Sequence, residues 1–525
     1  MIVFFLASLL LSVISGVLLT FIFLSYPQNS RRDLPLRIFV GGGLGIGLSA
    51  CLYFVSLAAG LAGYIPLIDL SACLLLGVAY SVLLKRGRRK TERLNCEPVG
   101  QSEDMEPRLP TRKAALPATK SKLETWIAAV FAIELFASLG SFFVAFLQEP
   151  HGRWDAWLIW NMHARFLYRS GEAWRDVFAG GMEWSHWDYP LLLPLSIVRG
   201  WKYSGNDSSY IPAAFALIFT LLTLGLLLSA LAFLRSRTQG FLAAMILLGT
   251  PLFIMMGASQ FADVPLAFFI LATLVLLFLP ERSPENGSGA LVLSGIAAGL
   301  CAWTKNEGLL FLLIVTTSLF GTTLYATEWK SALNRTIRFL AGALPIMLIV
   351  IYFKTQLSPV NDLMEGFRLT AAAVKLTDFS RYAEIAKAFF ITGISFTQGL
   401  VDIRAGMQLN FGAVSILLLI AYLLLAGVRI DDRDRTGILR TAAVLLLSLL
   451  GYFFIYVLTP LNLGYHLATS LNRLFLQLWP SIIFLFFMTA GAPERAASAE
   501  GRPDSGSARP EKIRRVRRAA AITQR

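Results

Sequence analysis

The sequence has little charge, few cysteines and few histidines for its length. Only 15% of its 525 residues are charged and 56% are hydrophobic, and its mean hydropathy is +0.62. Soluble domains carry roughly 45–50% apolar residues, so a water-exposed globular fold cannot absorb this composition. The sequence also lacks a Walker motif, an HExxH motif and any CxxC spacing among its four cysteines. These absences argue against a soluble fold, a P-loop nucleotide site, a zinc site and a disulfide framework.

Continuous apolar runs of helix length dominate the chain instead. A run of about 20 residues spans a hydrocarbon layer of about 30 Å as an α-helix. Because the runs do not alternate between apolar and polar residues, a β-barrel is excluded. We predict an all-α polytopic integral membrane protein, a bundle of about thirteen transmembrane helices. The predicted helices lie at 2–25, 37–59, 64–84, 125–147, 210–234, 241–258, 264–280, 289–303, 308–326, 336–353, 408–427, 437–458 and 473–490.

The first apolar run, Ile2 to Tyr26, has no basic segment before it and no convincing cleavage site after it. A basic segment and a cleavage site are both typical of a secretory signal peptide. We therefore interpret this run as a retained membrane helix.

Lysine and arginine residues give the helices an orientation. Basic residues accumulate in cytoplasmic loops, and the strongest cluster is Lys85 to Lys90. With an odd number of spans, this places the N-terminus on the outer face of the membrane and the C-terminus in the cytoplasm. Membrane topology and contact with lipids account for the net charge of +14. Nucleic-acid binding is not indicated, because neither basic cluster, 85–122 or 509–518, contains interleaved aromatic residues. The segments on the outer face would be 148–209, 259–263, 304–308, 354–407 and 459–472.

The composition divides the chain into four parts. Residues 1–84 would form three accessory transmembrane helices, and 85–124, rich in charge and proline, a disordered basic cytoplasmic linker. Residues 125–490 would be the catalytic transmembrane module, and 491–525 a disordered cytoplasmic tail. A dinucleotide-like glycine pattern lies inside the second apolar run, where no strand precedes it, so close helix packing explains it better. The glycines concerned are Gly41, Gly43, Gly45 and Gly47, and the same reading applies to Gly295 and Gly299.

Two acidic motifs lie in the segment 148–209. The first is Trp154-Asp155-Ala156-Trp157, and the second is His186-Trp187-Asp188-Tyr189-Pro190. A carboxylate close to hydrocarbon loses hydration, which favours a general-base role for Asp155. The alternative is an aromatic belt at the membrane interface with one solvated aspartate. Asp188 would lie near the boundary because the following run, 191–201, is too short to span and would lie along the surface; alternatively, Asp188 only caps that helix.

Three further outer positions carry charge or a histidine. Asp263 could be a site residue, although a helix start followed by proline explains it equally well. Lys305 and Glu307 interrupt two apolar runs, where a charge costs about 2.5–3.5 kcal/mol, so a functional role is the default hypothesis over a solvated turn. Arg473 begins the last helix beyond His466. It could bind a phosphate with two parallel hydrogen bonds or extend toward the lipid headgroups.

Taken in order, these motifs resemble bacterial GT-C glycosyltransferases of the protein O-mannosyltransferase and aminoarabinose transferase group. The resemblance covers about residues 125–485. It departs from that group in three ways: Ala156 stands where relatives often have a second acidic residue, three helices precede the module, and no large C-terminal soluble domain follows. The motifs that carry the resemblance are Trp154–Trp157 with Ile159-Trp160-Asn161, His186–Pro190, Ala262–Leu266, Trp303–Gly308, and His466–Ser470 with Arg473 and Leu478–Pro480.

The resemblance implies a GT-C-like fold with a periplasmic catalytic loop, 148–209, that carries juxtamembrane helices. It implies transfer of a sugar from a polyprenyl-phosphate donor to a glycan, lipid or protein acceptor. Asp155 would be the catalytic base, Asp188 would bind the acceptor, or a divalent metal if one is used, and Lys305 and Arg473 would contact the phosphate. The remaining candidates for substrate binding are Trp154, Trp157, Asn161, His186, Tyr189, Asp263, Glu307 and His466. No metal ligands and no cofactor are assigned.

Two other functions fit the same residues. A transporter or flippase for a lipid-linked or anionic solute would show internal repeats and broken helices, which the sequence does not clearly display. A non-catalytic membrane protein of envelope assembly would tolerate changes at all the acidic positions. The sugar, the acceptor, the oligomeric state and the role of the three leading helices stay open.

Overall fold

The computed structural model of the protein describes residues 2–24, 33–96, 122–180, 183–282, 287–360, 368–395 and 412–493. In this part of the chain the regular structure is helical, apart from one isolated bridge between Val428 and Ala490. The predicted tail and most of the predicted linker lie outside the described residues. The all-α polytopic fold is confirmed.

The helices follow the predicted apolar runs closely. The N-terminal half contains α1 (Ile2–Phe23), α2 (Leu34–Ala58), α3 (Ile65–Cys96), α4 (Lys122–Gln148), α5 (Asn161–Arg169), α6 (Leu192–Ser204), α7 (Tyr210–Leu234), α8 (Arg237–Leu248) and α9 (Pro251–Ala258). The C-terminal half contains α10 (Asp263–Arg282), α11 (Gly287–Thr304), α12 (Glu307–Ala326), α13 (Trp329–Gln356), α15 (Leu369–Thr377), α16 (Phe379–Ser395), α17 (Gly412–Ala426), α18 (Arg435–Leu458) and α19 (Leu463–Thr489).

Within the described ranges, eleven helices are long and apolar enough to cross a membrane, or up to twelve if one bent pair counts as a span. The number is lower than the thirteen predicted for two reasons. Helices α8 and α9 meet at an angle of 67° instead of forming one straight rod, with Pro251 starting α9. The apolar part of α17, Ile416–Ala426, is shorter than a full span. Hydropathy alone does not register either feature.

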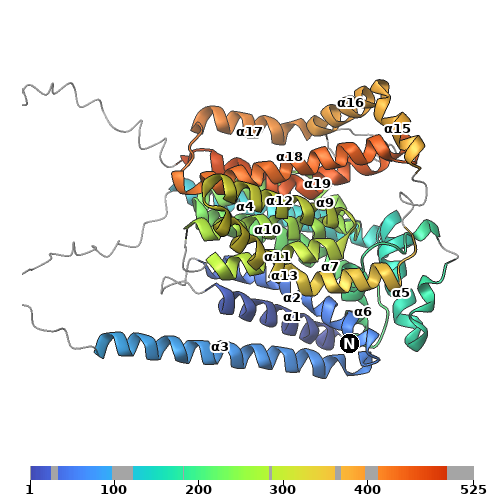
Figure 1. The fold of residues 1–525 in the computed structure, drawn as a ribbon, viewed down its shortest axis with the longest axis horizontal. Helices are drawn as coiled ribbons and strands as arrows, with labels where there is room; N and C mark the ends of the chain where they lie inside the picture. Colours follow the sequence, from blue (N-terminus) through green and yellow to red (C-terminus); the bar gives the residue numbers. More distant parts are fainter. Residues whose placement is uncertain are drawn as a thin grey trace, which may run out of the picture.

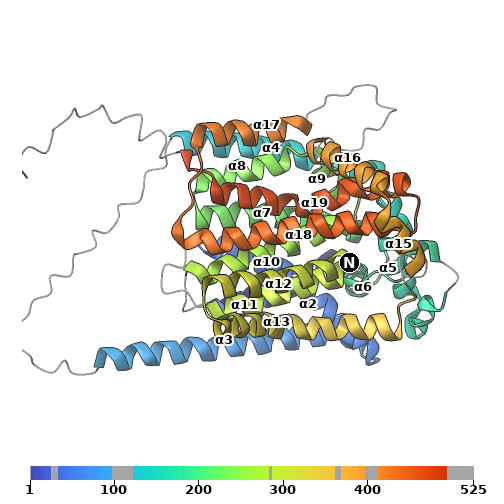
Figure 2. The same ribbon diagram turned by 45° about the horizontal axis from the view of Figure 1, so that its top comes forward.

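The long helices run side by side in one bundle, and α10 lies at its centre (Figures 1 and 2). Residues 263–280 of α10 are all buried, and the helix packs against α7, α11 and α19. A helix that is apolar on every side is stable only where neighbours or lipid surround it. The first residue of α10 is Asp263, so the central helix brings a carboxylate to one end of the bundle.

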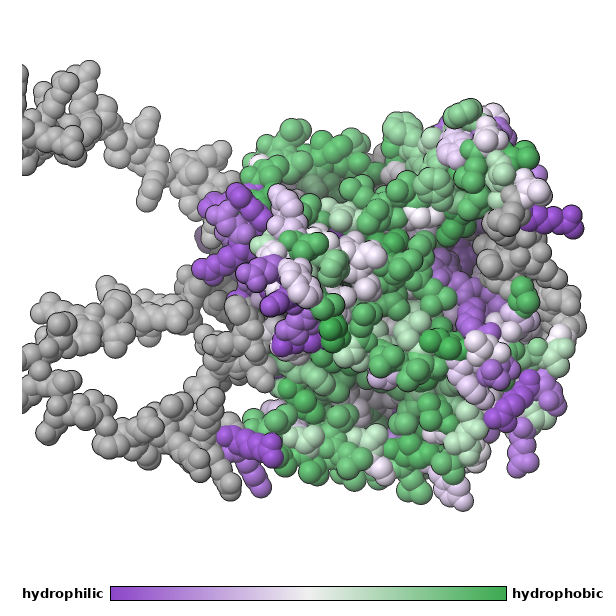
Figure 3. Space-filling model, viewed as in Figure 1, coloured by the Kyte–Doolittle hydropathy of each residue, from purple (hydrophilic) through white to green (hydrophobic). Residues whose placement is uncertain are grey.

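The bundle has two polar ends separated by an apolar band (Figure 3). We call them the loop end, which carries the segment 149–209, and the basic end, where α19 finishes (Figure 1). At the basic end, arginines of α10 and α13 form ion pairs, Arg282 with Asp434 and Arg335 with Glu281. Helix α1 begins at the loop end.

Helices α1 and α2 pack at backbone contact distance. A Cβ atom at Gly16 would lie 1.9 Å from the Gly41 carbonyl oxygen, and one at Gly45 would lie 1.9 Å from the Ser12 oxygen. At Gly43 it would overlap the ring of Phe268 in α10 at 1.9 Å. The prediction that these glycines serve helix packing is confirmed. The division of the chain into an accessory bundle and a catalytic module stays a prediction.

Two expectations about element boundaries are wrong. Helix α3 continues to Cys96, twelve residues into the segment predicted as a disordered linker (85–124). Lys, Arg and Glu are good helix formers, so a helix already nucleated in the apolar run can propagate into them. The run that follows Asp188 does not lie along the surface, because α6 is buried from Leu192 through Trp201.

A buried ion pair explains why α6 is held inside the bundle. The Arg199 Nε atom donates to Asp69 Oδ2 of α3 at 2.8 Å, and its Nη2 atom donates to the Ser8 carbonyl oxygen of α1 at 3.1 Å. The Tyr203 hydroxyl donates to the same Asp69 oxygen at 2.7 Å. Two leading helices thus contribute partners to the helix that directly follows the Asp188 motif.

Candidate active site

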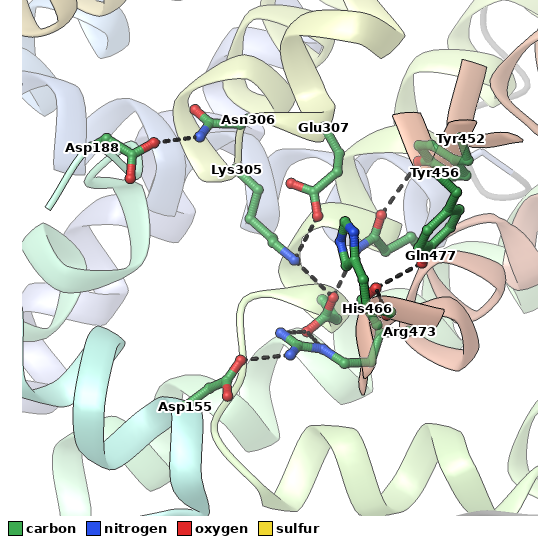
Figure 4. A network of polar contacts seen from close by, with 12 residues as sticks. Asp155, Asp188, Lys305, Asn306, Glu307, Tyr452, Tyr456, His466, Arg473 and Gln477 are labelled. Atoms are coloured by element: carbon green, nitrogen blue, oxygen red, sulfur yellow. Dashed lines mark hydrogen bonds and ion pairs between the residues drawn. The ribbon is translucent and has the colours of Figure 1, made fainter. Parts of the chain in front are cut away.

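The site is built around the buried carboxylate of Asp263 at the loop end of α10. Its Oδ1 accepts hydrogen bonds from Lys305 Nζ at 3.1 Å and Gln477 Nε2 at 2.7 Å. Its Oδ2 accepts from Arg473 Nε at 3.1 Å and Nη2 at 2.9 Å (Figure 4). The side chain of Asp263 is 0% exposed. Its partners are side chains from α19 and from the turn between α11 and α12, so helix capping does not explain this residue.

Arg473 of α19 joins this carboxylate to Asp155 in the segment before α5. The Arg473 Nη1 atom lies 2.5 Å from Asp155 Oδ2, while Nε and Nη2 contact Asp263. The guanidinium carbon also lies 4.9 Å from the ring centroid of Phe261, within the range of a cation–π contact. One arginine from the last helix therefore connects two carboxylates from two earlier segments of the chain (Figure 4).

Lys305, in the turn between α11 and α12, is the second cation of the network. Its Nζ atom lies 2.8 Å from Glu307 Oε1 as well as 3.1 Å from Asp263. Burial by itself lowers the pKa of Lys305, but the charges of Asp263 and Glu307 outweigh burial and raise the pKa above its usual value. Lys305 is therefore charged at neutral pH.

Asp188 forms a second polar group beside the first. Its Oδ2 accepts from Asn306 Nδ2 at 2.8 Å. The Lys354 Nζ atom donates to Asn306 Oδ1 at 2.8 Å and to the Asp188 carbonyl oxygen. Because Lys305 and Asn306 are consecutive, one turn positions partners for both Asp263 and Asp188 (Figure 4).

Tyr189 follows Asp188 in the sequence and is buried near both groups. Its ring stacks on Trp160 at 5.6 Å and on His186 at 5.0 Å. Burial raises the pKa of Tyr189, and the carboxylates of Glu307, Asp188 and Asp155 raise it further, while Arg473 opposes them. All four charged side chains interact electrostatically with the Tyr189 hydroxyl. The hydroxyl stays protonated and can donate a hydrogen bond.

Residues with an unusual backbone conformation lie shortly before Asp188 and Asp263. Gln260 and His186 are the non-glycine residues with positive φ in the described ranges, at 62° and 53°. Such angles cost free energy unless the surroundings enforce them, and they are frequent at functional sites. Asn161 supports the turn at Gln260, because its Nδ2 donates to Gln260 Oε1 at 2.7 Å. Residues 156–160, directly after Asp155, form a π-helical turn, another feature common at functional sites.

His163 packs against the Asp188 motif as a neutral side chain. Its ring stacks on Trp187 at 3.9 Å, and Nε2 lies 2.8 Å from the Ser185 carbonyl oxygen, so it is the donor. Among the described residues, the buried Nδ1 atom has no hydrogen-bond partner. Burial lowers the pKa of His163 to about 3, more than the contact with Ser185 raises it. A proton on Nδ1 would thus be a buried charge without a partner.

We expect acidification to destabilise the loop end through His163. Because the folded-state pKa lies below the unfolded value, the stabilisation is complete above about pH 6.5 and decreases as the pH falls toward 3, by roughly 1.4 kcal/mol per unit. The unfolding midpoint of the purified protein, measured between pH 7.5 and 5, should fall less in His163→Gln than in the wild type. Parallel curves for the two proteins would contradict this account.

The structure brings most of the sequence-predicted site residues together at the loop end. Asp155, Asp263, Lys305, Glu307 and Arg473 share one network, and the Asp188 group adjoins it. His466 contacts this region through the ring of Tyr456, at 4.8 Å, and through Thr459 Oγ1, at 2.9 Å. Among the predicted residues outside this network, Trp154 and Trp157 are 70% and 54% exposed, and Asn161 donates to Gln260 and to the His151 carbonyl oxygen.

Sequence reasoning missed Lys354, Gln477, Asn306 and Gln260 as parts of the site. Gln477 is a lone amide inside an apolar helix, which is a usable signal because buried amides need partners. Asn306 lies inside the Thr304–Gly308 motif, but its own side chain was not singled out. Lys354, at the loop end of α13, offered no signal beyond its charge. Within the described segments, no group of three or more His, Cys, Asp or Glu side chains is placed to hold a metal ion.

Comparison with known families adds one finding. Residues 192–353 match the family described as dolichyl-phosphate-mannose-protein mannosyltransferase. The matched range runs from α6 to the end of α13, so it includes Asp263, Lys305 and Glu307, whereas Asp155, Asp188 and Arg473 lie outside it. No curated protein and no solved structure gave a significant match. The resemblance predicted from the motifs is confirmed at the level of the superfamily.

Proposed function

We propose that this membrane glycosyltransferase of the GT-C type transfers a sugar from a polyprenyl-phosphate donor to an envelope acceptor. The transfer takes place at the periplasmic face of the bacterial inner membrane, on the loop end of the bundle. The observation that carries the proposal is the bridge formed by Arg473 between Asp155 and Asp263, beside Lys305. It combines a partly exposed carboxylate with two cations, the groups needed to accept a proton and to hold a departing phosphate.

In the proposed reaction, Asp155 accepts the proton of an acceptor hydroxyl while the hydroxyl oxygen attacks the anomeric carbon. The bond between this carbon and the phosphate oxygen breaks, and the oxygen leaves with the electron pair as polyprenyl phosphate. Attack on the face opposite the phosphate inverts the configuration. Arg473 and Lys305 stabilise the charge that develops on the phosphate, a guanidinium and an ammonium being suited to this task. The protonated Tyr189 hydroxyl can donate a hydrogen bond to a sugar or phosphate oxygen.

Asp188 orients the acceptor in this proposal. Its side chain is 2% exposed and already bound by Asn306 and close to Lys354, so it is held in a defined position. A carboxylate with a fixed orientation positions a hydroxyl more accurately than a freely rotating one, and positioning contributes a large part of catalysis in group transfer.

The direct test is a transfer assay with the purified protein in liposomes. The donor is a polyprenyl-phosphate sugar with a radioactive sugar, and the acceptor is a periplasmic envelope fraction. We expect label to enter the acceptor fraction with release of one polyprenyl phosphate for each sugar transferred. Glu172→Gln, which changes an exposed acid of the same segment, should transfer at the wild-type rate. Movement of intact labelled lipid across the bilayer without product would indicate a flippase instead and refute the proposal.

Lys354→Met should weaken acceptor use without affecting the donor. The change removes the hydrogen bonds from Nζ to Asn306 and to the Asp188 carbonyl oxygen. Hydrogen bonds of a charged group contribute about 1.5–3 kcal/mol, which corresponds to at least a tenfold change in an equilibrium constant. We expect the acceptor KM to rise about tenfold, with the donor KM unchanged, and Lys354→Arg to restore part of the loss. An equal rise in both KM values would show that Lys354 only maintains the fold.

A further inference from the structure

The guanidinium of Arg473 has two ends in different surroundings. Its Nε and Nη2 atoms contact Asp263, whose side chain is fully buried and also receives Lys305 and Gln477. Its Nη1 atom contacts Asp155, whose side chain is 21% exposed. One end is therefore anchored in the core, and the other faces the accessible part of the site.

Each of the two cations of the network contacts two carboxylates. Lys305 lies between Asp263 and Glu307, and Arg473 lies between Asp263 and Asp155. Three carboxylates thus share two cations. A phosphate can bind the cations closely only if one carboxylate gives up its contact, since like charges at hydrogen-bond distance repel strongly.

Of the two carboxylates on Arg473, Asp155 can leave more easily than Asp263. Asp263 accepts four hydrogen bonds from three side chains inside the bundle, and its loss would leave Lys305 and Arg473 with one carboxylate each instead of two. Asp155 is held by Arg473 alone among the described side chains. Its release costs one ion pair, and water or substrate can replace part of that contact.

We propose that the phosphate of the donor displaces Asp155 from Arg473 Nη1, and that this exchange frees the Asp155 carboxylate to act as base. The inference rests on the proposed function, and it adds an order of events to it. Without donor, Asp155 stays paired. With donor bound, Arg473 bridges Asp263 and the phosphate, and Asp155 faces the acceptor.

The exchange couples donor binding to activation of the base. While Asp155 accepts the hydrogen bond from Arg473 Nη1, that carboxylate oxygen is occupied. Once the phosphate has taken its place, the carboxylate is free to turn toward the acceptor hydroxyl. The base therefore faces the acceptor only when the sugar donor is in place, and a donor-free site does not activate an acceptor hydroxyl.

The exchange makes a distinctive prediction for binding, which needs no turnover. Asp155 competes with the phosphate for Nη1, so Asp155→Asn should bind a prenyl phosphate more tightly than the wild type. A hydrogen bond to a charged group supports an increase in affinity of about tenfold. Asp155→Glu retains the competitor and should bind like the wild type. Asp188→Asn is the matched control, because it removes a neighbouring carboxylate that pairs with Asn306 instead of Arg473.

The experiment is titration of the full-length protein in detergent with farnesyl phosphate by isothermal calorimetry, for the wild type and the three variants. Tighter binding in Asp155→Asn alone supports the exchange. Equal affinity in wild type and Asp155→Asn overturns it but leaves the proposed donor class intact, since the phosphate still binds. Equal tightening in Asp155→Asn and Asp188→Asn also overturns it, because loss of any negative charge would then suffice. Absence of binding to every protein refutes the donor class and the exchange together.

Discussion

Asp155→Asn should lower turnover by about 10²–10⁴-fold while the protein stays folded, because a positioned base contributes an acceleration of that order. Asparagine has the shape of aspartate but no charge, so it fills the same space and competes only weakly for Arg473 Nη1, while the hydrogen bonds to Asp263 are retained. The loss should therefore appear in kcat, whereas donor affinity does not fall. The measurement is the rate of sugar transfer at saturating donor and acceptor, at equal amounts of folded protein.

Two comparisons make this result specific to Asp155. Asp155→Glu moves the carboxylate by one methylene group and should recover part of the rate, since the basic group is present but displaced. Glu172→Gln, on the same segment but exposed, should have no effect on transfer. Turnover of Asp155→Asn within a factor of two of the wild type would remove Asp155 from the mechanism and direct attention to Asp188 as the base.

Asp263→Ala should destabilise the protein more than any other single change at the site. Removing one partner of a buried ion pair typically costs about 3–5 kcal/mol because the remaining charge is left without compensation. Here the change would leave Lys305 and Arg473 without their shared carboxylate and Gln477 without its acceptor. We expect a large fall in the unfolding midpoint of the purified protein in detergent, together with loss of transfer.

A second substitution distinguishes this explanation from a simple packing defect. If the loss of a shared carboxylate by two buried cations causes the destabilisation, Lys305→Met in the Asp263→Ala background should recover part of the lost stability, although Lys305→Met alone destabilises the wild type. This sign reversal is a coupling energy and can be read from a double-mutant cycle. Additive losses in the double variant would mean that Asp263 acts through packing at the start of α10.

The course of the helices through the bundle was largely predictable from the sequence. Continuous apolar runs leave few alternatives to membrane helices, because every backbone polar group must be satisfied inside its own segment. The errors arose where packing rather than hydropathy decides. Helix α6 is only 13 residues long, and it is buried because Arg199 finds Asp69 in a helix 130 residues earlier. The bend between α8 and α9 has a different, local cause, since the helix is interrupted at Gly249 and Pro251.

Most residues of the site were predictable from the sequence, but the pairs that they form were not. The distribution of Lys and Arg placed five separate segments on one face of the membrane. Each of these segments, or a residue directly next to it, contributes a side chain at the loop end. The specific partnership of Asp155 with Arg473 joins residues 318 positions apart. Nothing in either local sequence indicates that the two are neighbours, or that Lys354 would lie beside Asp188.

By itself, the sequence determined that the chain is a multispanning helical membrane protein with acidic and basic groups gathered on one face. Hydrophobic transfer and the cost of burying charge act on each segment separately, so they can be read segment by segment. Only the tertiary structure decided which carboxylate shares which cation. That choice depends on contacts between distant helices, and it is what turns Asp155, Asp263 and Arg473 from separate charged residues into one network with an anchored end and an exchangeable end.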